Sequence, residues 1–112
     1  MPTNESILGS IKSMLGVLDE SFDPELQIHI NTVFPELFQL GLESAKEFEI
    51  NDASSKWSDL QLGPSQSWVK SFVFYKVKLA FDPPQTANAV QAIKDELNHL
   101  SWRINISLES GV

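Results

Sequence analysis

The chain has 112 residues, which suits one domain, and we expect residues 1–112 to fold as a single unit. It contains no cysteine, so disulfide bonds, thiolate metal sites and a cysteine nucleophile are excluded. The formal net charge is −7: residues 1–66 carry three basic and eleven acidic side chains, and residues 67–112 carry five basic and four acidic ones, which argues against a domain that grips DNA through a dense basic face.

A first amphipathic helix is predicted from about Glu5 to Leu18, with Thr3 or Asn4 as its N-cap. Gly9 and Gly16 each lower its intrinsic stability by about 1 kcal/mol relative to alanine, so docking rather than propensity must hold it. Its apolar residues recur at the three-to-four spacing of one helical face and are Ile7, Leu8, Ile11, Met14, Leu15 and Leu18.

A second helix is expected to start at Asp23, as N-cap, with Pro24 in the first turn and Gly41 at its end. Pro35 interrupts it, and a proline inside a helix costs about 3 kcal/mol. The helix should therefore kink at Pro35 or restart there. Its apolar stripe comprises Leu26, Ile30, Val33, Leu37 and Leu40.

The segment that follows, residues 42–64, is the least regular part of the sequence. Polar and apolar residues alternate over residues 47–50, and a turn-like run follows at residues 51–55. Residues 56–60 either return as a second strand or form an ordered loop. We therefore expect a short β-hairpin or an irregular insertion between the second and third helices.

A third helix is predicted over residues 66–81, with Ser65 as N-cap and apolar side chains around so much of its surface that it should be central. Two prolines after Phe81 end it, and a fourth helix should start near residues 85–87. Residues 104–112 alternate in polarity and predict an extended C-terminal tail that could add a strand to a neighbour. The predicted fold class is all-α, with about four helices in a small bundle.

The sequence offers no recognisable catalytic machinery. His29 and His99 fall on different predicted helices, the carboxylates form solvated clusters, and neither a nucleophile elbow nor a glycine-rich phosphate loop is present. We therefore expect a non-enzymatic protein without metal or cofactor. The alternative is a small regulatory protein that binds nucleic acid through polar residues of the last helix, although phosphate-contacting basic residues are missing there. Those polar residues are Gln85, Asn88, Gln91, Lys94 and Asn98.

The N-terminal 18 residues do not have the basic start of a signal peptide, and no apolar run reaches the roughly 18 residues that cross a bilayer. We therefore expect a soluble, intracellular protein. Its acidity either serves solubility or repels phosphate where DNA must slide past. If the second holds, the candidates to face such a channel are Glu43, Glu47, Glu49 and Asp52.

Several stretches, in order along most of the chain, resemble the head–tail connector proteins, also called head completion or adaptor proteins, of tailed phages and prophages. Pro35 departs from the family pattern, where an ordinary helix former is more usual. The resembling stretches are Ile7-Leu8-Gly9-Ser10-Ile11-Lys12, Leu15-Gly16, Phe22-Asp23-Pro24-Glu25-Leu26, His29-Ile30-Asn31, Gln39-Leu40-Gly41, Trp57-Ser58-Asp59, Val69-Lys70-Ser71, Tyr75-Lys76-Val77-Lys78-Leu79, Phe81-Asp82-Pro83-Pro84 and Trp102-Arg103-Ile104-Asn105.

The resemblance implies an all-α protein with a small β element that assembles into a ring beneath the portal, extends the DNA channel and docks the next tail component. Its partners would be further copies of itself, with a dodecamer as one option, the portal protein and a head–tail junction or tail protein. DNA would pass through without specific binding. The protein would reside in the host cytoplasm during assembly and then in the virion at the head–tail junction. The family has no catalytic residues to transfer.

A ring requires one protomer to present two different faces that meet head to tail. Four short helices carry more apolar side chains than a small core can hide, so the surplus on residues 68–80 and 97–108 supplies the candidate faces. Trp57 and Trp102 can each be either core or interface residues. The interface candidates are Trp57, Trp68, Phe72, Tyr75, Trp102, Ile104, Ile106 and Leu108.

Overall fold

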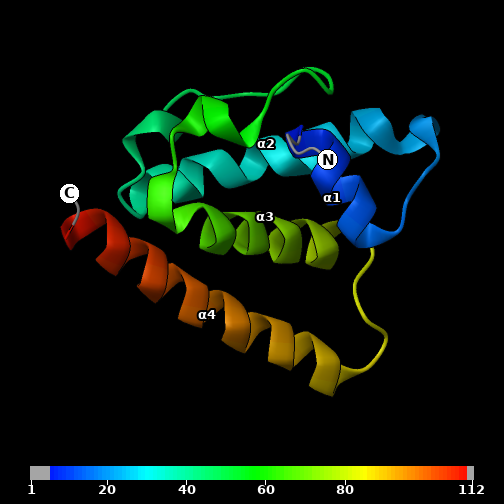
Figure 1. Ribbon diagram of the computed structural model, residues 1–112. Coiled ribbons are helices and arrows are strands. Elements are labelled where there is room, and N and C mark those ends of the chain that lie inside the picture. The colour runs from blue at the N-terminus through cyan, green and yellow to red at the C-terminus, as the bar shows by residue number, and fades with distance from the viewer. Residues whose placement is uncertain (1–5, 111–112) are drawn as a thin grey trace.

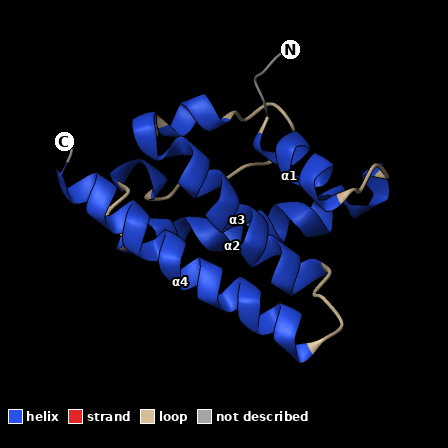
Figure 2. Ribbon diagram, turned by 60° about the horizontal axis from the view of Figure 1, so that its bottom comes forward, coloured by secondary structure: helices blue, strands red, loops and turns tan. Residues whose placement is uncertain are grey.

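The computed structural model describes residues 6–110, and within them it contains four α-helices and no strand (Figures 1 and 2). The helices are α1 (Ile7–Leu15), α2 (Asp23–Gln39), α3 (Gln66–Phe81) and α4 (Ala87–Ser110). The predicted all-α fold class is confirmed.

Helix α3 is the centre of the fold, because it packs against α1, α2 and α4. Its buried side chains are Val69, Phe72, Val73 and Val77. Helix α4 runs back along α3, and most of the segment between α2 and α3 lies on the other side of α3 (Figures 1 and 2). The end of this segment, residues 63–65, contacts α4. Because neighbours pack against several sides of α3, its apolar side chains are covered around much of the helix, as the sequence predicted for residues 66–81.

Helix α1 is shorter at both ends than its apolar pattern suggested. Ser6 caps it, with its Oγ accepting a hydrogen bond from the Gly9 backbone N–H at 2.8 Å, so the predicted caps are wrong. Thr3 and Asn4 themselves lie outside the described residues. Gly16 ends the helix in the left-handed conformation, with φ of +79°, which glycine adopts without steric cost.

Helix α2 begins at Asp23 and continues through Pro35 to Gln39, so it does not restart at the proline. The buried side chains of Val33, Phe34 and Leu37 on either side of Pro35 hold both halves in the same core. Asp23 is the first helical residue rather than the N-cap. Its carboxylate lies 2.7 Å from Lys12 Nζ and joins α2 to α1.

The segment between α2 and α3 contains no β-hairpin, so that alternative of the prediction is wrong and the irregular one is correct. The amide of Asn31 explains why: its Oδ1 accepts from the Ile50 backbone N–H at 2.8 Å, and its Nδ2 donates to the Ile50 carbonyl at 3.0 Å. A side chain of α2 therefore makes the backbone hydrogen bonds that a partner strand would make. The segment instead contains the short 3-10 helices η2 (Glu43–Ala45), η3 (Trp57–Leu60) and η4 (Gly63–Ser65).

Helix α3 has the predicted bounds, although Ser65 Oγ donates back to the Leu62 carbonyl rather than capping the helix. Helix α4 continues to Ser110, so the predicted extended tail over residues 104–112 is wrong for residues 104–110; residues 111–112 lie outside the described part. Ile104 is fully buried, and Asn105 Nδ2 donates to the Leu40 carbonyl at 2.8 Å. These contacts fix the end of α4 against the end of α2.

Candidate assembly surface

Large apolar side chains are exposed in two regions of the described chain and at one further position on α2. Trp102 and Ile106 lie on α4, and a second group surrounds the turn between α1 and α2. The exposed set comprises Met14, Leu18, Phe22, Ile28, Trp102 and Ile106. Surface of this kind marks contact sites when several such residues gather together.

The exposed face of α4 is opposite its buried face. Successive residues of a helix turn by about 100°, so Trp102 and Ile106, four residues apart, share one side. Leu97, Leu100 and Ile104 occupy the other side and are buried against α3. Trp102 is 63% exposed and Ile106 is 43% exposed, which leaves an indole available to a partner.

One positively charged group, the Arg103 guanidinium, lies beside Trp102 on the same helix. The Arg103 guanidinium stacks over the Trp68 ring at 5.6 Å, and Arg103 Nε donates to His99 Nε2 at 2.9 Å. The stacking on Trp68 and the hydrogen bond to His99 hold the guanidinium in place before any partner arrives. We call His99, Trp102 and Arg103 the α4 patch, and Ile106 lies at its edge.

The second exposed region lies between α1 and α2 and includes η1 (Glu20–Phe22). Leu18 is 88% exposed, and Phe22 packs edge-on against Phe81 with ring centroids 5.5 Å apart. We call Met14, Leu18, Asp19, Glu20 and Phe22 the N-terminal patch.

Asp19 keeps its negative charge within this patch. The backbone N–H of Ser21 donates to its Oδ1 at 2.9 Å, and this bond, a Ser21 hydroxyl and the Lys12 charge lower the pKa of the Asp19 carboxyl. The N-terminal patch is therefore anionic at neutral pH.

A family model described as phage connector protein matches residues 7–111. The chain belongs to the phage connector protein family. The match covers all four helices, confirms the resemblance inferred from the sequence and gives the protein a general role as a structural connector in phage particles. Comparisons with curated proteins and with solved structures found no match. No helix in the described part of this connector protein is long and apolar enough to cross a membrane.

Three of the predicted interface residues belong to the core of the connector protein. Trp57 and Phe72 are 2% exposed and Ile104 is fully buried, so none of them contributes to the surface of the protomer. The Trp57 indole Nε1 instead donates to Ser10 Oγ of α1 at 2.8 Å. The core alternative for Trp57 is the correct one.

The other predicted interface residues lie at or near the surface of the connector protein. Trp68 is half-buried under Arg103, and Tyr75 is half-buried with its ring 5.1 Å from that of Phe74. Leu108 is half-buried beside Gly41. Trp102 and Ile106 are the exposed members.

The sequence analysis did not predict that the N-terminal patch would also be exposed. The residue that could have indicated it is Gly16, which ends α1 before Leu18 can join the buried face of that helix.

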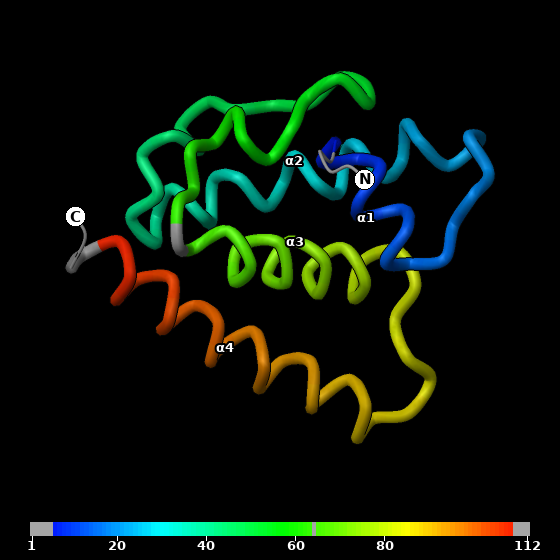
Figure 3. Tube along the Cα trace, viewed as in Figure 1, coloured from blue at the N-terminus to red at the C-terminus, as the bar shows by residue number. Residues whose placement is uncertain are grey.

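The four acidic candidates are all exposed. They lie in the segment between α2 and α3, which we call the irregular segment. Hydrogen bonds from the Ser54 hydroxyl at 2.6 Å and the Ser54 backbone N–H at 2.8 Å lower the pKa of the Asp52 carboxyl. The part of this segment that carries the acidic candidates lies on the opposite side of α3 from most of α4 (Figure 3). The acidic candidates and the α4 patch therefore face different surroundings.

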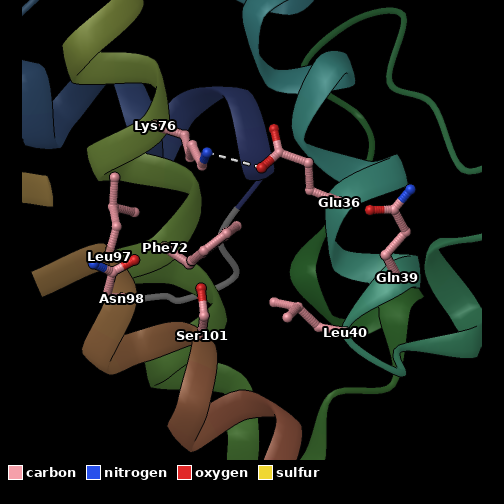
Figure 4. Close-up of a pocket in the computed structure, with 8 residues that line it drawn as sticks. All are labelled: Glu36, Gln39, Leu40, Phe72, Lys76, Leu97, Asn98 and Ser101. Atoms are coloured by element: carbon pink, nitrogen blue, oxygen red, sulfur yellow. Dashed lines mark ion pairs between the residues drawn. The ribbon is translucent and has the colours of Figure 1, made fainter. Parts of the chain in front are cut away.

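A small pocket of about 180 Å³ opens between α2, α3 and α4 of the connector protein (Figure 4). An ion pair between Lys76 Nζ and Glu36 Oε1, at 2.8 Å, crosses it. The volume is below the roughly 300 Å³ at which small-molecule sites begin. Across the described residues, the structure gathers no group of three or more histidine and acidic side chains able to hold a metal.

Proposed function

We propose that this connector protein forms a homo-oligomeric ring at the portal vertex and joins the DNA-filled head to the tail. The observation that carries the proposal is the family match over residues 7–111, which spans the whole described fold. In this function the protein binds the portal protein on one side and a head–tail junction or tail protein on the other. It acts without chemistry of its own, and DNA passes through the ring without being read.

The surface of the protomer supports this proposal physically. A closed ring needs two different contact faces on each copy, because the same pair of surfaces must meet at every junction. The α4 patch and the N-terminal patch are two such faces, each with exposed apolar side chains. Tryptophan and arginine, both present in the α4 patch, are enriched among the residues that dominate interface energies.

Binding to the portal protein tests this function. We expect light scattering coupled to size-exclusion chromatography to show a portal complex whose mass exceeds that of the portal by several copies of the connector. The matched control is an acidic helical protein of similar size, which should leave the portal mass unchanged. A portal whose mass does not change at a large excess of the connector would contradict the function.

Charge reversal of Glu43, Glu47 and Glu49 to lysine tests whether the acidic segment faces DNA. All three side chains are exposed, so the free energy of unfolding should change by less than about 0.5 kcal/mol each. If they line the channel, the new ammonium groups attract phosphate, and we expect particles of normal composition with a large loss of infectivity and incomplete DNA passage.

The matched control replaces the same three residues with glutamine, which removes the negative charge without adding a positive one. Its infectivity should lie between those of the wild type and the lysine variant. Plaque counts and the DNA content of purified particles measure both variants. Normal infectivity of the lysine variant would show that these carboxylates serve solubility alone.

A further inference from the structure

The two patches of the connector carry opposite charge. The N-terminal patch contains the carboxylates of Asp19 and Glu20 and no lysine or arginine. Lys12 lies just outside the patch and pairs with Asp23 at 2.7 Å. Residues 97–108, which contain the α4 patch, include one positively charged side chain, Arg103, and no acidic residue, and Glu96 and Glu109 flank this stretch. The acidic side chain nearest to this stretch on its N-terminal side is Glu96. Asp95 precedes it and accepts a hydrogen bond from Gln91 at 2.9 Å.

The patches also lie far apart on one protomer. The turn after α1 and the C-terminal half of α4 are at opposite ends of the molecule, whose longest dimension is 38 Å (Figures 1 and 3). One copy therefore cannot satisfy its own patches with each other. A second copy can, since it brings the complementary patch on a separate body.

We propose that the α4 patch of one copy docks on the N-terminal patch of the next copy and that this contact forms the ring. The inference rests on the proposed ring function and adds which surfaces meet. Trp102 is the anchor, placed against Leu18 and the neighbouring Met14 and Phe22. The guanidinium of Arg103 faces the carboxylates of Asp19 and Glu20.

Charge favours this pairing over contact between like patches. Two α4 patches would bring two arginines together, and two N-terminal patches would bring two acidic clusters together, with the repulsion that disfavours wrong partners. A contact between unlike patches leaves one free patch of each kind on the resulting dimer. Further copies can then add until the ring closes.

Cross-linking between introduced cysteines tests the pairing, and the absence of native cysteine makes every reactive thiol an intended one. Ser21→Cys places a thiol beside the N-terminal patch, and Ile106→Cys places one at the edge of the α4 patch; neither removes Leu18 or Trp102. The two variants are mixed with the portal protein present and treated with a short bismaleimide linker. We expect a cross-linked dimer from the mixture and little from either variant alone.

A directional control separates the two faces. Trp102→Glu on the Ile106→Cys chain should weaken the contact at least about 30-fold, the scale of a hot-spot residue, and abolish the cross-link. The same change on the Ser21→Cys chain should leave the cross-link intact, because that chain supplies only its N-terminal patch to the linked junction. Leu18→Glu should show the reverse dependence. Ala53→Cys, exposed in the irregular segment, is the negative control when mixed with Ile106→Cys.

Two results would overturn the pairing. Cross-links of equal yield in each single variant would show that like patches meet. No cross-link in the mixture, although light scattering shows the connector bound to the portal, would show that other surfaces form the junction. The second result would leave the proposed function in place, whereas loss of portal binding by the wild-type chain would remove the function itself.

Discussion

Replacing Trp57 with alanine is expected to lower the free energy of unfolding by about 3–5 kcal/mol. The indole is 2% exposed, and its removal leaves a large cavity between α1 and the irregular segment. It also removes the hydrogen bond from Nε1 to Ser10 Oγ. Because a domain of this size is stabilised by only about 5–15 kcal/mol, the variant should be largely unfolded well below the midpoint temperature of the wild type. Urea titration followed by far-UV circular dichroism measures the loss.

Trp102→Ala is the matched control, because it removes the same side chain from an exposed position. Its indole is 63% exposed, so the free energy of unfolding should fall by less than about 1 kcal/mol. Equal losses in the two variants would contradict the placement of Trp57 in the core. Trp102→Ala should instead weaken assembly, which separates a folding residue from a contact residue of the same type.

Replacing Ile104 with alanine is expected to cost about 2–5 kcal/mol of folding stability. Ile104 is fully buried where α4 packs on α3, and alanine leaves a cavity in that contact. The variant should unfold at lower urea concentration with an unchanged slope, as expected when stability alone is altered.

Ile106→Ala is the control that distinguishes a helix from the extended tail predicted by sequence. In an extended chain residues 104 and 106 point to the same face, so both changes would have similar effects. In α4 they lie on different faces, and Ile106 is 43% exposed, so we expect a loss below about 1 kcal/mol. Similar losses for the two variants would argue against a helical end of α4.

The helices were largely predictable because their boundaries carry strong local signals. Helix α3 has the predicted bounds, since Gly63-Pro64 precedes it and Pro83-Pro84 follows it. The central position of α3 followed from its apolar surface. The start of α2 was placed within one residue by Asp23 and Pro24.

The errors arose where tertiary contacts decide between two locally equivalent patterns. Ile104, Ile106 and Leu108 alternate as in a strand, but Ile104 and Leu108 are also helical neighbours four residues apart. Residues 47–50 alternate as well, yet Asn31 of α2 supplies the hydrogen bonds of the missing partner strand. The pattern around residues 47–50 cannot reveal that the Asn31 amide, 19 residues before Ile50, forms these bonds.

The candidate surface was predicted only in part for the same reason. Trp102 and Ile106 are exposed on α4, whereas Trp57 lies in the core, where its Nε1 donates to Ser10 Oγ. Met14 and Leu18 of the N-terminal patch were predicted to belong to the apolar face of the first helix, so their exposure was not expected. Only the left-handed turn at Gly16 separates the exposed Leu18 from the buried Ile11.

Helix α4 is anchored unevenly, and this has a mechanical consequence. Between residues 87 and 96 no side chain is fully buried and Ile93 packs only partly against the core, whereas Leu97, Leu100 and Ile104 are buried in the following turns. Because fewer buried side chains hold the first three turns, bending or tilting them should cost less energy than moving the half that carries the α4 patch. If the proposed ring assembles through the buried half of α4, the angle between neighbouring copies should stay constant, while the less anchored half could adjust its position to fit a different partner.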